Sequence, residues 1–202
     1  MRHTGSYGSG LLAVAAMVAT LLGWPLAGDA QTVTGEARGV QATVLGLLGG
    51  TTTVLADTGA LGGTSDALQA SALRGSVPSL LTGEVLHATT IAGPGQVASE
   101  ASLANLALNV AGTTVGADLV MARAQAVLGG VGRGTSDIAN LSINGVPIPV
   151  GGDTNQTISI PGGVVVINEQ QTSPTGTVVN ALHVIVNGVA EVVIGSATAG
   201  IY

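Results

Sequence analysis

The 202-residue sequence predicts an all-β fold, an antiparallel β-sandwich of short strands joined by Asn-Gly and Gly-rich turns. Three observations support this prediction. Short apolar runs alternate with Gly, Asn, Pro and Asp, a pattern typical of successive strands and turns. Asn-Gly pairs separate such runs at Asn144 and at Asn187. After residue 30 the only aromatic residue is Tyr202, so the core must be aliphatic, and its β-branched members favour strands.

The first 30 residues have the features of a signal peptide. Arg2 and His3 form a short basic start, residues 11–22 are an apolar run, and residues 28–30 offer small residues at the cleavage positions. The apolar run is shorter than the roughly 20 residues that a membrane-spanning helix needs. We therefore expect cleavage after Ala30, no remaining transmembrane segment, and a secreted, extracellular or cell-surface location.

Residues 31–202 are expected to form a single domain. The chain contains no cysteine, which excludes disulfides, thiolate metal sites and cysteine nucleophiles. With Arg2 and Asp29 in the leader, the remaining chain has four arginines, ten carboxylates and no lysine. Nucleic-acid binding requires a basic surface that neutralises phosphates, so this class of partner is excluded.

Apolar runs predict ten strands, and the Asn-Gly pairs predict how some of them connect. Asn-Gly supplies the two positive φ angles of a type I′ turn, so two-residue hairpin loops are expected at Asn144 and at Asn187. The predicted strands are residues 40–48, 51–56, 84–92, 97–110, 113–127, 138–143, 157–160, 164–168, 178–187 and 189–198.

Two segments, residues 65–75 and 117–130, fit either a helix or a strand. Both are rich in helix formers and end at glycine, and Ser65 or Asp66 could cap a helix in the first. As a strand, the second segment would have a believable two-sided pattern, and we favour the strand for both. One face would then carry Leu119, Met121, Arg123 and Gln125, and the other Val120, Ala122, Ala124 and Ala126.

The chain also contains a short internal sequence repeat. Residues 99–118 align without a gap with residues 134–153, sharing Ala-Asn-Leu, a later Asn and a closing Gly-x-Asp. A solenoid needs about three or more stacked units to bury a continuous face. A repeated hairpin within one sandwich is therefore the simpler interpretation, with a β-helix (solenoid-like) or a β-barrel as the alternative architectures.

The second half of the chain resembles a known family. The segments ANLSINGVPIPV, NQTISIPGGVVVINEQQTS, TVVNALHVIV and VVIGSATAGI are together similar to the choice-of-anchor P family of bacterial surface and secreted proteins. The similarity is clearest over residues 138–201. It implies an extracellular all-β domain displayed by an anchor, and it implies no particular activity or catalytic residue.

The expected function is that of a non-enzymatic structural or adhesive domain at or beyond the bacterial cell surface. Unlike the family pattern, the sequence ends at Tyr202 without a sorting signal, so release, or attachment through a cell-envelope or matrix partner, is expected. Long Val, Thr and Ala strands with few charges favour edge pairing and self-association. The alternatives are a calcium- or ligand-binding extracellular module and, less favoured, a secreted hydrolase.

The sequence contains two acid-base pairs that are catalytic candidates, Glu84 with His87 and His183 with Glu191. In a strand, the spacing of three between Glu84 and His87 places them on opposite faces. With a two-residue turn after Val186, residue Val192 would lie opposite His183, so His183 is not expected to face Glu191. No catalytic residue is therefore assigned.

Nucleophile and metal motifs are weak. The sequences around Ser76, Ser79 and Ser196 miss the Gly-x-Ser-x-Gly pattern of a nucleophile elbow. Asp153 and Asn155 are weak candidates for a calcium site, because calcium takes about six to eight oxygen ligands and this loop supplies two. No other cofactor is expected.

Overall fold

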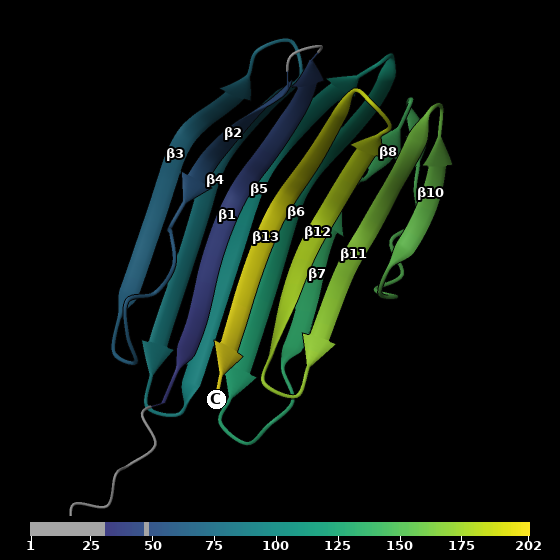
Figure 1. The fold of residues 1–202 in the computed structure, drawn as a ribbon. Helices are drawn as coiled ribbons and strands as arrows, with labels where there is room; N and C mark the ends of the chain where they lie inside the picture. Colours follow the sequence, from purple (N-terminus) through teal and green to yellow (C-terminus); the bar gives the residue numbers. More distant parts are fainter. Residues whose placement is uncertain (1–30, 47–48) are drawn as a thin grey trace, which may run out of the picture. The chain divides into compact units, whose positions relative to one another are not determined.

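The computed structural model describes residues 31–46 and 49–202, which form strands and no helix (Figure 1). The all-β prediction is confirmed. Both ambiguous segments are strands, β3 (Ala67–Val77) and β6 (Thr113–Val127). The predicted leader and the last two residues of the predicted strand 40–48 lie outside the described residues.

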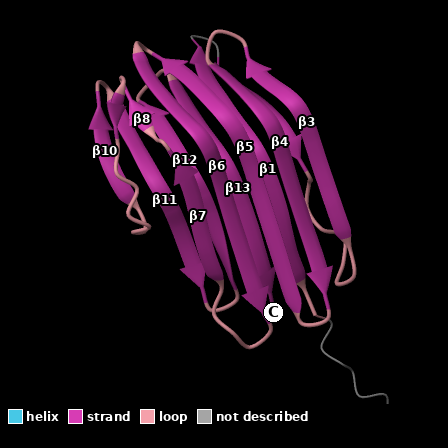
Figure 2. Ribbon diagram, turned by 180° about the vertical axis from the view of Figure 1, so that it is seen from behind, coloured by secondary structure: helices cyan, strands magenta, loops and turns pink. Residues whose placement is uncertain are grey.

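The strands form two antiparallel sheets that face each other (Figures 1 and 2). Sheet A has the order β10 (Gln156–Ile160), β11 (Gly163–Ser173), β12 (Gly176–Val186), β13 (Ala190–Ile201), β1 (Val33–Gly46), β2 (Gly49–Asp57). Sheet B has the order β3, β4 (Leu81–Gly93), β5 (Gln96–Val110), β6, β8 (Ser142–Ile143), β9 (Val146–Pro147), and β7 (Arg133–Ala139) also pairs with β6. In the described part of the chain both sheets are open at their edges, as a sandwich requires.

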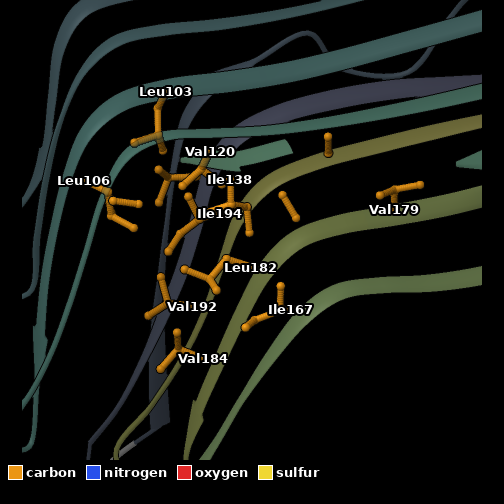
Figure 3. Packing of buried hydrophobic residues seen from close by; sticks show 14 of the residues in the cluster. Leu103, Leu106, Val120, Ile138, Ile167, Val179, Leu182, Val184, Val192 and Ile194 are labelled. Atoms are coloured by element: carbon orange, nitrogen blue, oxygen red, sulfur yellow. The ribbon is translucent and has the colours of Figure 1, made fainter. Parts of the chain in front are cut away.

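The core lies between the sheets and is aliphatic, as expected. Strand β13 of sheet A packs across β5 and β6 of sheet B. Ile194 and Leu182 from sheet A lie with Leu103 and Val120 from sheet B in one cluster (Figure 3), and all four are fully buried. Of the two faces proposed for β6, the one with Val120 is the buried face.

In each long strand, every second residue points inward, as expected. At one position along the strand this alternation shifts, so that the inward-pointing residues change from even-numbered to odd-numbered positions or the reverse. In β13, Val192 and Ile194 are buried, and beyond Gly195 the buried residues are Ala197 and Ala199. Gly195 has a φ of 62°. We call such a position a face switch, and the switches form one row across each sheet. The row in sheet A is Ala56, Gly39, Gly195, Ala181 and Asn168, and the row in sheet B is Leu73, Val85, Asn105, Asp118 and Asn140.

Six of the ten face switches have positive φ and therefore a local backbone cause: Ala56, Gly195, Asn168, Val85, Asn105 and Asn140. Residues with positive φ break the period-two alternation of a strand, and asparagine tolerates this conformation better than most other L-residues. Asn105 and Asn140 have φ values of 51° and 53°, and each precedes a buried leucine. These residues belong to the Ala-Asn-Leu triplets of the internal sequence repeat. The repeat therefore marks two face switches that lie in the same row of sheet B.

The two Asn-Gly pairs form different turns. Asn144 and Gly145 both have positive φ, and their neighbours Ile143 and Val146 pair directly, which confirms the predicted two-residue type I′ turn.

At the second Asn-Gly pair the prediction is wrong. Val186 pairs with Ala190, which leaves Asn187, Gly188 and Val189 as a three-residue loop. Only Gly188 in this loop has positive φ, and the amide of Val189 donates to the carbonyl of Val186 at 3.0 Å, as in a type II turn with glycine at its third position. The extra loop residue shifts the expected register of β13 by one.

Candidate functional site

The largest group of side chains hydrogen-bonded to one another in the described residues lies on the outer face of sheet A. It consists of Glu191, His183, Glu169, Asn180 and Ser196, contributed by β11, β12 and β13. We call these five residues the His183 network.

His183 is at the centre of this network, with a carboxylate at each ring nitrogen. Its Nδ1 lies 2.9 Å from Oε2 of Glu169, and its Nε2 lies 3.0 Å from Oε1 of Glu191. Asn180 donates to the same Oε2 of Glu169 at 2.6 Å, and Ser196 donates to Oδ1 of Asn180 at 2.8 Å. His183 is only 8% exposed, so it is held between strands rather than displayed to solvent.

The turn after β12 brings His183 and Glu191 together, contrary to the prediction. Because the loop has three residues, Glu191 pairs with Ile185 and Val193 pairs with His183. A shift of one residue in register moves a side chain to the other face of the sheet. Glu191 is therefore a diagonal neighbour of His183 on the outer face.

The face switch in β12 completes the network. Asn180 and His183 are three residues apart, a spacing that would put them on opposite faces of a regular strand. Ala181 and Leu182 between them are both buried, so Asn180 and His183 share the outer face. One oxygen of Glu169 can therefore accept hydrogen bonds from both.

His183 bridges two carboxylates that come from the strands on either side of it. Each carboxylate can accept a hydrogen bond from a ring nitrogen that carries a proton. Both ring nitrogens of His183 have a carboxylate partner, and Ser196 bonds to Asn180 instead of the ring. The arrangement ties three neighbouring strands together through charge-assisted hydrogen bonds.

The polar row continues across sheet A beyond Ser196. Arg38 pairs with Ser196 across β1 and β13. Its guanidinium contacts the carboxylates of Glu36 and Asp57 and donates to Gln41 at 3.1 Å. A band of hydrogen-bonded polar side chains thus crosses the outer face of sheet A.

The two carboxylates beside His183 are expected to contribute unequally to stability. Glu169 has 22% of its side chain exposed and accepts two hydrogen bonds, whereas Glu191 is 58% exposed and accepts one. Glu169→Ala should lower the free energy of unfolding by about 2 kcal/mol, since it leaves Asn180 and His183 without their acceptor. Glu191→Ala should cost less than about 1 kcal/mol, as exposed ion pairs do. Urea unfolding of both variants measures the difference, and equal losses would contradict this account.

Glu84 and His87 lie on the same face, not on opposite faces as predicted. Val85 between them has a φ of 49° and is a face switch, so the strand alternation is broken at that point. Glu84 accepts a hydrogen bond from Asn105 at 2.9 Å and lies 3.8 Å from the guanidinium of Arg74. The Glu84 carboxylate therefore contacts side chains of both neighbouring strands, β3 and β5.

The weak calcium candidates lie in the loop before β10. Asn155 has a φ of 59°, and its Oδ1 accepts the backbone N–H of Gln170 at 2.9 Å. Asp153 is exposed, and its backbone carbonyl accepts from Asn168 at 3.2 Å. Among the described residues no three His, Asp or Glu side chains are grouped so that they could hold a metal ion. Calcium at Asp153 and Asn155 stays a prediction.

The serine candidates are dispersed. Ser196 belongs to the His183 network, Ser76 lies near the end of β3, and Ser79 lies in the turn before β4 with a φ of 61°.

Sequence reasoning missed Glu169 and Asn180. The available signal was the polar residues that interrupt the apolar strands VVVINEQQ and TVVNALHV. Buried or half-buried polar side chains in strands need partners, and here they are each other's partners.

Comparison with known proteins gives no relative: no family model, no curated protein and no solved structure matches this chain. The resemblance to the choice-of-anchor P family therefore stays a prediction. The described residues include no helix that is long and apolar enough to cross a membrane.

Proposed function

We propose that this chain is a non-enzymatic structural or adhesive domain, secreted or displayed at the cell surface, that self-associates by pairing strand edges. One observation carries the proposal: the sandwich has two long, sparsely charged edge strands on the same side. The signal-peptide features and the choice-of-anchor P resemblance are consistent with a location outside the cytoplasm.

The first of these edges is β3, which ends sheet B. It is eleven residues long, and Arg74 is its only charged residue. The segment 67–72 pairs in unbroken register with β4 and contains no charge, proline or lysine. Beyond it, at the face switch, Leu73 is 78% exposed.

The second edge is β2, which ends sheet A next to β3 (Figure 1). It is nine residues long, and its only charged residue is the last, Asp57. Threonine and glycine occupy most of its exposed positions. Both sheets are therefore open on the same side of the sandwich.

An open edge presents unpaired backbone N–H and C=O groups to any other extended strand. Natural proteins protect such edges with lysine, proline, bulges or covering segments. In β3 the only such feature is the face switch at Leu73, which leaves residues 67–72 regular. A strand edge of another copy can extend the sheet by main-chain hydrogen bonds. This would give oligomers or a matrix without any dedicated side-chain site.

The proposal is tested by charging the β3 edge. In the double variant Gln69→Lys and Ser71→Lys, like charges would meet when two copies pair, so the association constant should fall at least tenfold. The matched control, Thr82→Lys with Ala107→Lys, adds the same charge to exposed positions on the central strands β4 and β5. Sedimentation velocity over a wide concentration range measures the association of each protein.

Three outcomes decide the matter. Loss of association in the edge variant alone supports edge pairing. Equal loss in both variants would make net charge the cause and would contradict it. A wild-type protein that stays monomeric at every concentration also contradicts the self-association proposed here.

The proposed location is tested separately, by measuring the intact mass of the protein in each fraction of the native host. A chain that begins at Gln31 in the culture medium or at the cell surface is the expected result, and an uncleaved chain in the cytoplasm would contradict it.

A further inference from the structure

The outer face of sheet B contains a hollow that spans four strands, β4 to β7. The cavity has a volume of about 420 Å³. Two cross-strand rows form it, one of Thr89, Glu100, Arg123 and Thr135, and the other of Ile91, Ala98, Gln125 and Arg133. Pockets of this size accommodate small organic molecules.

The hollow exists because Ala98 is short. It lies on β5 directly between Ile91 and Gln125, and the neighbouring row carries Glu100 and Arg123. Long side chains surround a single methyl group, so Ala98 forms the floor and its neighbours form the walls. Ile91 is 51% exposed and gives the wall an apolar part.

Arg133 gives the hollow its charge. Of the four arginines in residues 31–46 and 49–202, it alone has no carboxylate from those same residues within the 4.0 Å distance of an ion pair. The adjacent Arg123 is paired with Glu100 at 2.6 Å. A net cationic group on a chain of net charge −6 is suited to an anion, and a guanidinium matches the geometry of a carboxylate.

A second hollow adjoins the first on the other side of Arg133. Its volume is about 630 Å³, and it is lined by Gln125, Val127, Gly130, Val131, Gly132 and Arg133. Val131 is 66% exposed and Val127 is 47% exposed. Arg133 therefore lines two neighbouring hollows that both contain apolar side chains.

We propose that this double hollow binds an aliphatic monocarboxylate, with the carboxylate on Arg133 and the alkyl chain against Ile91 or Val131. Glu100 beside the site disfavours a ligand with two negative charges. The inference does not depend on self-association, because the hollow lies on the face of sheet B and the open edge at β3.

Hexanoate is a suitable probe, followed through backbone amide shifts in ¹⁵N–¹H NMR spectra of the purified protein. We expect saturable shifts on β4 to β7 with a millimolar dissociation constant. Acetate, which lacks the chain, and 1-hexanol, which lacks the charge, should each bind at least fivefold more weakly. Equal affinity for all three, or shifts that centre elsewhere, would overturn the proposal.

Two variants separate the charge from the shape of the site. Arg133→Gln should weaken hexanoate binding at least tenfold, while Arg74→Gln on the same sheet should leave it unchanged. Ala98→Leu should abolish binding by filling the hollow, whereas Ala107→Leu, exposed on the same strand, should not. A folded Ala98→Leu protein, judged by its amide spectrum, that still bound hexanoate would contradict the assigned position.

Discussion

Replacing Ile194 by alanine is expected to lower the free energy of unfolding by about 3 to 5 kcal/mol, the upper part of the range for large-to-small core substitutions. Ile194 is fully buried where β13 packs across the opposite sheet, and it lies with Leu182 and Val120 in the core (Figure 3). Rigid strands on both sides limit how far the cavity can collapse. Urea unfolding monitored by far-ultraviolet circular dichroism measures the loss.

Ile185→Ala is the matched control for this variant. It makes the same chemical change on the neighbouring strand β12, but Ile185 lies on the half-buried outer face. Its expected cost is about 1 kcal/mol, because less apolar surface returns to water. If both variants lost the same free energy, the interface between the sheets would not be the main core.

The fold class could be predicted because its signals are local. Each strand is a run of apolar and β-branched residues, and the two-residue turn at Asn144 depends on two adjacent residues that both tolerate positive φ. The helix formers of residues 117–130 were overridden by packing. Alanines that would suit a helix line the buried face of β6, where small side chains let the sheets approach closely.

The face switches could not be predicted from alternation, because they are the points where alternation fails. Asn105 and Asn140 gave a partial signal, since asparagine is common at positive φ. Ala56 and Val85 gave none, because neither residue type favours that conformation. A single missed switch reverses the predicted face of every later residue in its strand, as at His87.

The His183 network was hidden for two physical reasons. Whether Glu191 faces His183 depends on one residue of loop length, and Asn-Gly occurs in loops of two residues as well as three. Glu169 reaches the histidine because β11 and β12 form a hairpin whose register includes the face switch at Asn168 and Ala181, and strand alternation does not predict that switch. The composition indicated weakly charged edges, but only the strand order identifies β3 as one of them.

Asn168→Ala is expected to cost about 3 kcal/mol, the sum of backbone strain and lost hydrogen bonds. Asn168 is 3% exposed, and its φ is 53°. Its Nδ2 donates to the carbonyls of Gly152 at 3.0 Å and Asp153 at 3.2 Å, and its Oδ1 accepts from Gln170 at 2.7 Å. Alanine can adopt the backbone conformation only with strain, and it removes the three side-chain hydrogen bonds of the buried Asn168.

Asn105→Ala separates these two contributions. Asn105 has nearly the same φ, 51°, but its side chain is exposed and makes one hydrogen bond, to Glu84. The strain is therefore matched while the three hydrogen bonds of a buried side chain are absent, and the expected loss is about 1 to 2 kcal/mol. Hydrogen exchange adds a local readout, because in the Asn168 variant the amide of Asn155 should lose protection. Equal losses with unchanged exchange at Asn155 would mean that Asn168 acts only through its backbone and does not hold the loop before β10.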